Sequence, residues 1–559
     1  APTASLQLEF IYGCNQAKQQ GNLNINVVGE LIYAISSVVV VLNKETRTQR
    51  FFRKHSKKIT CFNIDHQLVR VVSCSVGQKN QIFVWDSQNM MQLGSLEVTG
   101  EKVSSVEKYY FVSTQFSPRD DMVVAIDCSW DIFVWKWEEG ALVAKASSGK
   151  SVIFELKFNP FISKNDPPMF ATVGGSCVRF WTVAEKELTS RYGVVGDVGT
   201  LQTACSVAFL DRAHAVSGMQ DGSIYLWKTS AVIHNLTGAH SKPIMQLVCR
   251  EDLIYSGSRD GKPSNVDQPL YFPCLTCMLK HANPSDGKQP LGRLTCNLQV
   301  SLHKGGSVMA DCECVISAHV NTPIAVCIHP SRPIFATSGS DGTLRLWDLE
   351  TKRIINRHVV CRIGGAPADI QHTASCLDIS PGENEHLCAG LTNGILKIFG
   401  FSASGLQELF TLRELGSSDV RVVKYSSDGL KLAVANSENL IEIYSKQDFS
   451  NYVFSTRKQL VVSGHVTNID WSRCSSFLQI STSNFELVFL EVDQCKVVGS
   501  KTSVRNSDWD TQHCPIGWPM VGLYSREIQD HHITSVDRSF DDLILAGCNT
   551  NKIIMSSYP

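Results

Sequence analysis

The sequence predicts an almost entirely β-stranded protein, built from small sheets that repeat along the chain and form two rings. The first observation is a recurrent motif, an alternating apolar strand that ends in an aromatic residue. The second is the spacing of this motif, which is 45 to 52 residues within each half of the chain. The third is that the sequence shows no sustained helical period or heptad run. A period of about 40–50 residues with four short strands per unit is typical of WD40-type β-propeller blades.

The motif recurs in both halves of the chain. Three of its strands follow Asp-Gly or Asn-Gly pairs at Asp221, Asp341 and Asn393, which accept the positive φ values that two-residue hairpins need. The chain has room for about eleven to thirteen blades, whereas one ring holds about four to eight, so two propellers in tandem are expected. The aromatic residues that end the strands are Trp85, Trp135, Trp181, Trp227, Trp347, Phe399, Tyr444 and Phe489.

One repeat is nearly complete, in the stretch "SAHVNTPIAVCIHPSRPIFATSGSDGTLRLWDL". Its polar residues are expected to form the structural hydrogen-bond tetrad of WD blades, because buried polar groups must satisfy one another. His55, His240 and His465 occupy comparable places in other repeats. The predicted tetrad residues are His319, Ser338, Asp341 and Trp347.

The regular spacing breaks once, between Trp227 and Trp347. The stretch from about 262 to 295 is rich in Pro, Gly, Asn and Asp and loses the alternation, so it is interpreted as an irregular connection. The predicted division places an N-terminal segment and first strands in 1–45 and the first propeller in 46–262. The connection then occupies 263–300, and a second, atypical propeller occupies 301–559.

The composition excludes several classes of protein. The chain has 559 residues and a net charge of −1, so no whole-chain field draws it onto nucleic acid or an anionic membrane. The longest apolar run, Leu31 to Leu42, is too short to span a bilayer. The first residues do not have the pattern of a signal peptide. The 20 scattered cysteines fit buried thiols in a reducing, intracellular compartment better than a disulfide framework.

Four stretches carry a resemblance to a known family. They are "LEFIYG" (Leu8 to Gly13) with the following "GELIYAISSVVVVLNKETRTQRFF", "VRVVKYSSDGLKLAVANSENLIEIYS", "SGHVTNIDWSRCSSFLQISTSNFELVFLEV" and "RNSDWDTQHCPIGWPMVGLY". The first resembles the HELP motif and first blade of the echinoderm microtubule-associated protein-like family, and the last resembles a distinctive insertion of its second propeller. The resemblance extends from about residue 6 to 559. It implies a tandem pair of atypical WD40-type propellers that binds microtubules and tubulin.

The resemblance also assigns a place to the N-terminal segment. In the family the HELP motif is buried where the two rings meet, which implies a structural seam formed by Leu8, Phe10, Ile11, Tyr12 and Gly13. Three departures from the family pattern stand out. The sequence has no N-terminal coiled coil, the region around 262–315 matches poorly, and the family pattern continues with one more blade, so the second ring is expected to lack a final blade or to close in another way.

A basic run is the strongest local charge feature. It contains a single acid, Glu45. One interpretation is that the run contacts an acidic surface such as tubulin and its Glu-rich tails by electrostatic complementarity. The other interpretation is a solvated turn between strands, which is what most charge runs are. The candidate contact residues are Lys44, Arg47, Arg50, Arg53, Lys54, Lys57 and Lys58.

Metal sites are weaker alternatives. Cys274 and Cys277 form a CxxC pair, a common zinc half-site. The downstream cysteines at 312 and 314 are expected to lie on a strand, and the favoured interpretation is small buried hydrophobic residues. The adjacent His531 and His532 would diverge on an extended strand and are expected to lie in a loop. No metal, cofactor or catalytic residue is predicted.

The sequence therefore predicts a non-enzymatic microtubule-associated protein whose partners are tubulin and microtubules, together with other microtubule-associated or axonemal proteins. Nucleic acid and membrane are not expected partners. The expected location is the cytoplasm and its microtubule cytoskeleton, with the ciliary axoneme as a further expectation. One alternative is a WD40 scaffold that assembles other proteins without touching tubulin. Another is a propeller enzyme, which would need convergent polar groups at a ring centre that the sequence does not show.

Overall fold

The chain folds into two compact units in the computed structural model. The N-terminal unit comprises Glu9–Ala318, and the C-terminal unit comprises His319–Pro559 together with Ala1–Leu8. The structure describes residues 6–13, 23–77, 82–98, 109–149, 151–163, 165–175, 177–184, 187–250, 253–258, 278–279, 291–295, 299–303, 312–317, 319, 322–360, 372–382, 385–402, 405–412, 418–448, 451–459, 464–494, 496–504, 506–517, 520, 533–539, 542–549 and 552–558.

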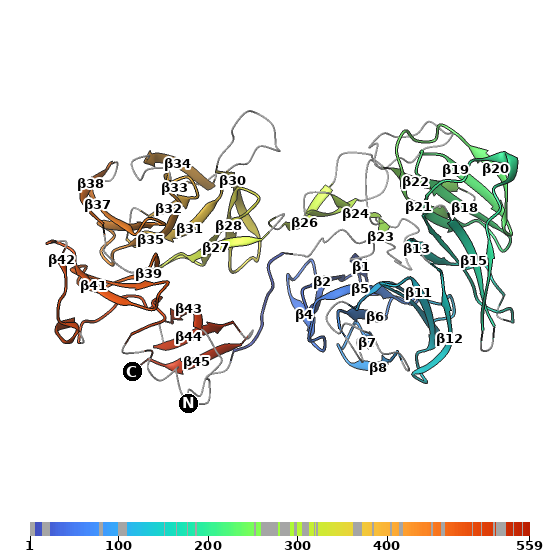
Figure 1. The fold of residues 1–559 in the computed structure, drawn as a ribbon, viewed down its shortest axis with the longest axis horizontal. Helices are drawn as coiled ribbons and strands as arrows, with labels where there is room; N and C mark the ends of the chain where they lie inside the picture. The colour runs from blue at the N-terminus through green and yellow to red at the C-terminus, as the bar shows by residue number, and fades with distance from the viewer. Residues whose placement is uncertain are drawn as a thin grey trace. The chain divides into compact units, whose positions relative to one another are not determined.

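The described part of the N-terminal unit forms seven antiparallel sheets from strands that follow one another in the chain (Figure 1). Six sheets have four strands and the sheet of β21 and β22 has two. The strands are β1 (Leu23–Ile25), β2 (Leu31–Ile35), β3 (Val38–Leu42), β4 (Gln49–Phe52), β5 (Ile59–Ile64), β6 (Arg70–Ser75), β7 (Ile82–Asp86), β8 (Gln92–Leu96), β9 (Phe111–Phe116), β10 (Met122–Asp127), β11 (Asp131–Lys136), β12 (Ala141–Ser147), β13 (Ile153–Phe158), β14 (Met169–Gly174), β15 (Cys177–Val183), β16 (Leu188–Tyr192), β17 (Ala204–Phe209), β18 (His214–Met219), β19 (Ile224–Lys228), β20 (Ala231–Leu236), β21 (Ile244–Arg250), β22 (Leu253–Ser258), β23 (Met278–Leu279), β24 (Leu291–Thr295), β25 (Gln299–His303) and β26 (Cys312–Ser317).

The described part of the C-terminal unit forms four four-stranded sheets and a last sheet of three strands. The described elements also include two short 3₁₀ helices, η1 (Gly196–Val198) in the N-terminal unit and η2 (Lys501–Val504) in the C-terminal unit. The strands are β27 (Pro323–Ile328), β28 (Ile334–Gly339), β29 (Thr343–Asp348), β30 (Ile354–Val359), β31 (Ala374–Ile379), β32 (His386–Leu391), β33 (Leu396–Ser402), β34 (Gly405–Leu412), β35 (Val420–Tyr425), β36 (Lys431–Asn436), β37 (Leu440–Asp448), β38 (Asn451–Gln459), β39 (Val466–Trp471), β40 (Phe477–Thr482), β41 (Leu487–Glu491), β42 (Lys496–Val497), β43 (Ile533–Arg538), β44 (Leu543–Cys548) and β45 (Ile553–Ser557).

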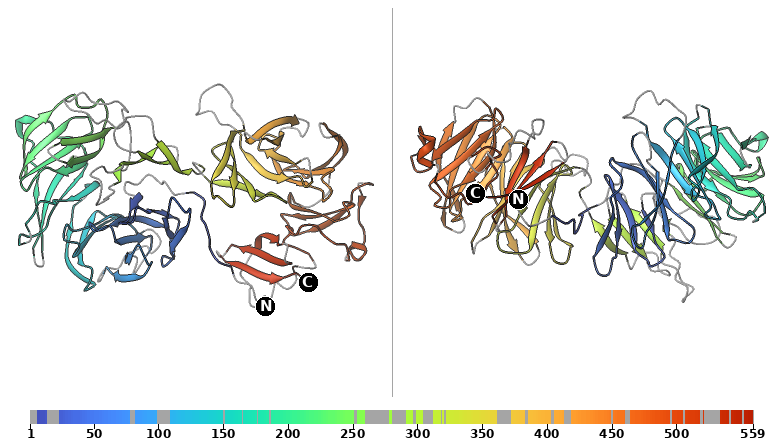
Figure 2. Two further views of the ribbon diagram at one scale, coloured as in Figure 1. Left: turned by 180° about the vertical axis from the view of Figure 1, so that it is seen from behind. Right: turned by 90° about the horizontal axis from the view of Figure 1, so that it is seen from below.

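In most of the described sheets the first strand lies beside the first strand of the next sheet, as blades are arranged around a ring. This holds for β5 and β9, β17 and β21, β27 and β31, and β35 and β39, and β23 lies beside β1. Figure 2 shows the sheets within each unit from behind and from below. The fourth residue of most first strands is buried, namely Phe62, Thr114, Leu156, Val207, Leu247, Leu377, Val423, Ile469 and Val536.

The predicted aromatic motif marks the third strand of each sheet in which it occurs. Trp85, Trp135, Trp181 and Trp227 lie on β7, β11, β15 and β19, and each is at most 1% exposed. The remaining four aromatic residues lie on β29, β33, β37 and β41. Alternation places these rings on one face of the third strand, where they pack into the blade core. The prediction of an all-β fold is confirmed.

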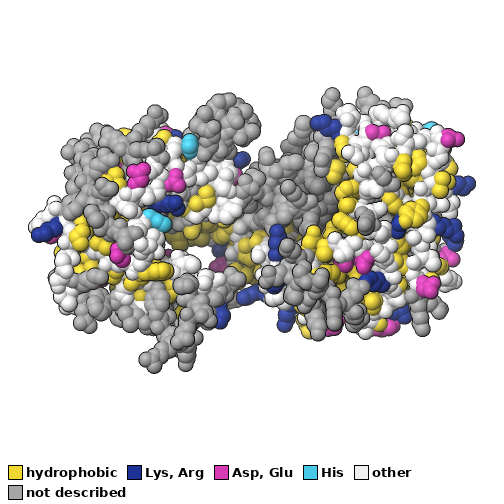
Figure 3. Space-filling model, in the orientation of Figure 1, with side chains coloured by type: hydrophobic (Ala, Val, Ile, Leu, Met, Phe, Trp, Pro, Cys, Tyr) yellow, Lys and Arg dark blue, Asp and Glu magenta, His cyan; other side chains and the backbone are white. Residues whose placement is uncertain are grey.

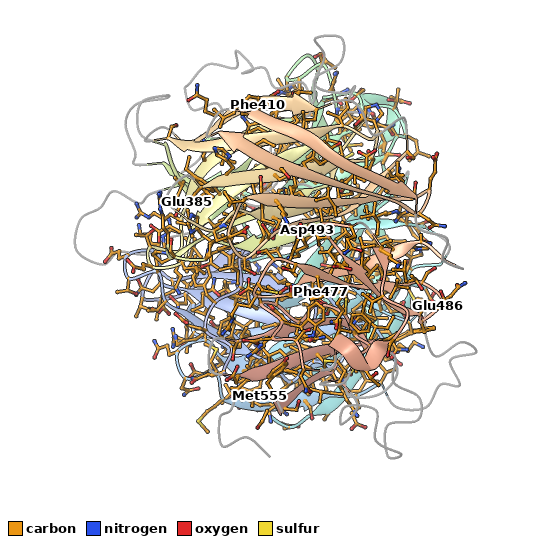
Figure 4. The ribbon with its side chains drawn as sticks, turned by 90° about the vertical axis from the view of Figure 1, so that its left-hand side faces the viewer. Glu385, Phe410, Phe477, Glu486, Asp493 and Met555 are labelled. Atoms are coloured by element: carbon orange, nitrogen blue, oxygen red, sulfur yellow. The ribbon has the colours of Figure 1, made fainter. Side chains whose placement is uncertain are left out.

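The first sheet of the C-terminal unit has one uncovered apolar face. On β27, Val326 is 65% exposed and Ile328 is 64% exposed, although the equivalent positions of the other described inner strands are mostly buried. Figure 4 shows the last two sheets of this unit, marked by Phe477 on β40 and Met555 on β45.

The region predicted as an irregular connection contains regular structure. Strands β23 and β24 lie within 263–300 and pair with β25 and β26 in a four-stranded sheet that belongs to the N-terminal unit. The boundary between the units falls between Ala318 and His319, later than the predicted residue 300.

Candidate functional site

The β4–β5 connection displays the exposed half of the predicted basic run. Phe52 ends β4 and Ile59 begins β5, and both side chains are buried. Between them, Arg53, Lys54, Lys57 and Lys58 are exposed, as is Ser56. The loop therefore presents four cationic side chains to solvent from a segment held at both ends. We refer to residues 53–58 as the basic loop.

His55 fastens the middle of the basic loop to the blade core. Its Nε2 lies 2.7 Å from Ser73 Oγ and its Nδ1 lies 2.9 Å from Ser75 Oγ, both on β6. The indole of Trp85 donates to the same Ser73 oxygen at 3.1 Å, and Phe52 stacks on the Trp85 ring at 4.5 Å between centroids. Burial lowers the pKa of His55 to about 4, so the ring stays neutral near pH 7. The loop is thus held to the blade at its middle as well as at both ends, which reduces the conformational entropy that is lost when a partner binds.

The other predicted basic residues have a different environment. Arg50 on β4 forms an ion pair with Glu30 and donates to the backbone carbonyl of Gln88. Its charge is therefore shared with the fold and is less available to a partner. Lys44 and Arg47 lie in the β3–β4 turn and are half-buried, and Arg47 has a left-handed φ of 56°. The structure thus divides the predicted contact set into an exposed basic loop and a structural part.

Basic residues elsewhere do not form one field on the surface shown in Figure 3. There, Lys and Arg side chains of both units occur in separate places and are interspersed with acidic ones. This agrees with the net charge of −1. A local loop with four cations and no acid is therefore a distinct electrostatic feature of the N-terminal unit.

The segment predicted as a structural seam packs on the first blade. Phe10 and Ile11 lie against the core formed by residues of β1, β2 and β3. The backbone N–H of Ile11 donates to Gln49 Oε1 at 2.7 Å, and Gln49 Nε2 donates to the Ile11 carbonyl at 3.1 Å. The Gln49 amide therefore acts as a strand partner for Ile11. Leu8, Tyr12 and Gly13 are half-buried, and Leu8 belongs to the C-terminal unit.

The predicted tetrad is present with one different member. His319 Nε2 lies 2.8 Å from Thr337 Oγ1, and the Trp347 indole donates to the same oxygen at 2.8 Å. His319 Nδ1 lies 3.1 Å from Asp341 Oδ1. The predicted hydroxyl was wrong, because Ser338 points to the opposite face of β28 and donates to the Ala374 carbonyl of the next blade.

The hydroxyl that accepts from the Trp indole lies at the same position of the second strand in each blade that has one. The hydroxyls that accept from the Trp indoles are Ser73, Thr172, Ser217 and Thr337, each at the fourth position of the second strand of its blade. His240 Nε2 lies 2.8 Å from Ser256, again a fourth position. His465 does not fit, because the fourth residue of β40 is Ile480, and the His465 side chain is exposed. A hydroxyl at this position was the sequence signal that distinguishes these histidines.

The structure brings together polar groups that sequence reasoning missed, on the inner strands of the C-terminal unit. Asp470 on β39 accepts hydrogen bonds from Thr511 Oγ1, from the His513 ring and from the backbone N–H groups of His513 and Cys514. Lys424 on β35 lies 3.1 Å from Asp378 on β31 and 3.4 Å from His513 Nε2. Burial alone would raise the pKa of Asp470, but these donors hold it far below its usual value. Both oxygens of the Asp470 carboxylate accept hydrogen bonds from residues 511–514, and these bonds anchor this part of the segment predicted as a family insertion.

Metal and membrane features are limited to what the described residues show. Within these ranges no cluster of three or more His, Cys, Asp or Glu side chains could hold a metal ion. None of the helices in the described segments has the length and apolar character of a membrane span. Cys274, Cys277, His531 and His532, named above as alternatives for a metal site, lie outside the described residues.

Comparisons with known proteins agree with the arrangement of the blades. The family model described as "Echinoderm microtubule-associated protein first beta-propeller" matches residues 48–284, and the model described as "Echinoderm microtubule-associated protein second beta-propeller" matches residues 324–559. The two matches confirm the prediction of two propellers in tandem.

Three named proteins are similar to this chain over its whole length. Echinoderm microtubule-associated protein-like 2 of Homo sapiens is 25% identical over 584 residues, which cover 100% of this chain and 85% of that protein. The 77 kDa echinoderm microtubule-associated protein of Lytechinus variegatus is 25% identical, with 100% and 83% covered. Echinoderm microtubule-associated protein-like 1 of Rattus norvegicus is 24% identical, with 100% and 68% covered. The chain therefore belongs to the echinoderm microtubule-associated protein-like family.

Proposed function

We propose that this protein is a microtubule-associated protein that binds tubulin through the basic loop of its N-terminal unit. The names of its relatives describe microtubule-associated proteins, and the similarity covers the whole chain. The observation that carries the proposal is the pinned loop, in which Arg53, Lys54, Lys57 and Lys58 are exposed around buried His55. Microtubules present Glu-rich tubulin tails, which are complementary to such a loop.

The mechanism is multivalent surface contact. Four cations on a rigid loop meet several carboxylates together, so each successive ion pair forms at a higher effective concentration than the first. Exposed ion pairs are individually weak, at about 0–1 kcal/mol each, and they are screened over about 8 Å at physiological salt. Binding is therefore expected to be salt-sensitive, with the broad faces of the two propellers supplying further contacts. We expect the protein on cytoplasmic microtubules, and stable ciliary microtubules are a further proposed location.

Co-sedimentation with stabilised microtubules across a salt series tests this proposal. The purified chain should pellet with microtubules at low salt and should be released progressively as salt rises. A chain that stays in the supernatant at low salt would contradict the proposal. That result would favour the alternative of a WD40 scaffold without tubulin contact, which capture of other proteins from the same extract would then examine.

A further inference from the structure

The basic loop contains one exposed hydroxyl among its cations. Ser56 is exposed and lies in the bend between buried His55 and exposed Lys57. Arg53 and Lys54 precede it at positions −3 and −2, and their side chains are also exposed. Any negative charge added at Ser56 would fall within the group of cations that the proposed function uses.

We propose that Ser56 is a phosphorylation site for a protein kinase that selects basic residues before its target serine, and that the phosphate weakens binding to acidic partners. This inference rests on the proposed function of the basic loop. Kinases of this class recognise Arg and Lys through acidic grooves, in which the planar guanidinium of a residue such as Arg53 can pair with a carboxylate. Arg53 and Lys54, the two side chains that such a groove would bind, are exposed. The residue directly before Ser56, His55, is buried in the blade and would not contact the kinase.

The chemistry is an ordinary phosphoryl transfer. Ser56 Oγ attacks the γ-phosphorus of magnesium-bound ATP, the new Oγ–P bond forms, and the bond between that phosphorus and the β–γ bridging oxygen breaks. ADP leaves, and the hydroxyl proton passes to the carboxylate base of the kinase. A phosphatase reverses the modification by hydrolysis, with water as the attacking group. Both partners act in trans, so this chain supplies only the hydroxyl and its recognition sequence.

The electrostatic effect follows from the size of the added charge. A phosphoserine carries about −1.5 to −2 charges near pH 7, whereas the loop carries four exposed cations. Phosphorylation would therefore cancel roughly half of the local charge. The phosphate oxygens would also accept hydrogen bonds from Arg53 or the nearby lysines, which withdraws these groups from an external carboxylate. The anchors Phe52, His55 and Ile59 are buried, so the modification leaves the blade core in place.

A nearby hydroxyl provides a contrast within the same chain. Thr46 in the β3–β4 turn is also exposed, but it follows Glu45 and its Oγ1 lies 2.8 Å from Thr48 Oγ1. It has no arginine at −3. A kinase that selects basic residues should therefore discriminate between Ser56 and Thr46, although both lie beside the same blade.

The first experiment identifies the site. The full chain, S56A and R53A are incubated with ATP and the catalytic domain of a kinase that prefers basic residues, and phosphopeptides are quantified by mass spectrometry. Ser56 should be the principal site, S56A should lose that phosphopeptide, and R53A should lower the initial rate of Ser56 phosphorylation by about tenfold, the loss of one ion pair with the kinase. Phosphate incorporated at other residues, with Ser56 unmodified, would overturn the inference.

The second experiment measures the effect of the phosphate on two acidic probes, poly-glutamate and stabilised microtubules. Phosphorylated protein should leave poly-glutamate at lower salt than unmodified protein and should bind microtubules several-fold more weakly. S56E should shift both in the same direction by less, and S190E is the matched control, because Ser190 is exposed on β16 of another blade. Unchanged elution from poly-glutamate after phosphorylation would overturn the switch. Weakened poly-glutamate binding by a protein that never pellets with microtubules would support the switch and contradict the proposed function instead.

Discussion

The imidazole of His55 and the hydroxyl of Ser73 lie 2.7 Å apart, and this pair joins the basic loop to the core of the second blade. The Ser73 oxygen also accepts a hydrogen bond from the Trp85 indole, so one hydroxyl joins the histidine ring and the indole in the blade core. Burial lowers the pKa of this imidazole to about 4, so the ring is neutral near pH 7. The side chain that fixes the proposed binding loop is therefore also a group that titrates in the mildly acidic range.

We expect the stability of the N-terminal unit to fall as the pH decreases from about 6.5 to about 4. The pKa of His55 is about 4 in the fold because of burial, and about 6.5 in an unfolded chain. In that interval the unfolded chain binds more protons, so acid favours unfolding, by up to roughly 3 kcal/mol at this residue. Chemical denaturation at pH 7, 6 and 5 measures the change.

The variant H55Q separates this effect from the titration of carboxylates. It should be less stable than the parent chain at pH 7, but its stability should change less steeply between pH 6.5 and pH 5. Parallel curves for the two proteins would show that His55 does not cause the pH dependence.

The hydroxyl of Thr337 should stabilise its blade more than its methyl group does. T337V keeps the shape of the side chain but leaves the Trp347 indole and the His319 ring without their common partner. A buried polar group that loses its hydrogen bond costs about 1–3 kcal/mol. T337S keeps the oxygen and should cost less than T337V in thermal or urea unfolding. Equal destabilisation by both variants would mean that packing, rather than the shared hydroxyl, determines the effect.

Gln49 should determine how firmly the N-terminal segment is held. Its amide makes two hydrogen bonds with the backbone of Ile11, so Q49L removes both while keeping an apolar stem of similar length. We expect faster amide hydrogen exchange at residues 10–12 and a loss of roughly 1–2 kcal/mol in stability. Q92L on β8 is the matched control, because Gln92 is exposed. Unchanged exchange in Q49L would show that the apolar contacts of Phe10 and Ile11 are sufficient.

Asp470 should be essential for docking residues 511–514. D470N replaces an anion that accepts from two backbone N–H groups and the His513 ring, and breaking such a buried network typically costs about 3–5 kcal/mol. The folded pKa of Asp470 is lowered, so its contribution is present above the unfolded pKa of about 4 and is lost as the pH falls below that value.

The control for D470N is D493N. Asp493 pairs with Lys431 at 2.9 Å, but its side chain is 73% exposed, so its loss should cost under about 1 kcal/mol. Hydrogen exchange across 506–517 reports docking directly. A D470N protein with native protection in this segment would show that the apolar contacts of Trp509 with Phe489 hold it in place.

Much of the fold could be predicted because its signals are local and repeated. The aromatic residue that ends each third strand, from Trp85 to Phe489, is encoded by alternation within five or six residues and by a nearly constant period. The choice between Thr337 and Ser338 was not predictable in this way. The two hydroxyls are adjacent, and only the register of β28 decides which of them faces the Trp347 ring.

The candidate site was only partly predictable for the same reason. A charge run shows that seven cations are close in the chain, but not which of them the fold uses. Arg50 on β4 pairs with Glu30, which lies twenty residues earlier, just before β2 of the same blade, and such non-local pairing has no sequence signature. The Asp470 network joins three strands and the insertion at 511–514, so it appears only when the blades are assembled.

Reversing the charge of the basic loop should abolish its contribution to microtubule binding without unfolding the blade. Arg53, Lys54, Lys57 and Lys58 are exposed, so their replacement by Glu should change unfolding by under about 1 kcal/mol while co-sedimentation at low salt falls strongly. Arg50 is kept, because R50E would oppose Glu30 and destabilise the first blade. Reversing Lys228, Arg353 and Arg421, which are also exposed, is the control for nonspecific charge, and it should weaken binding much less. Equal weakening by the two sets would mean that microtubules respond to net charge rather than to this loop, and unchanged binding of the loop variant would remove residues 53–58 from the contact.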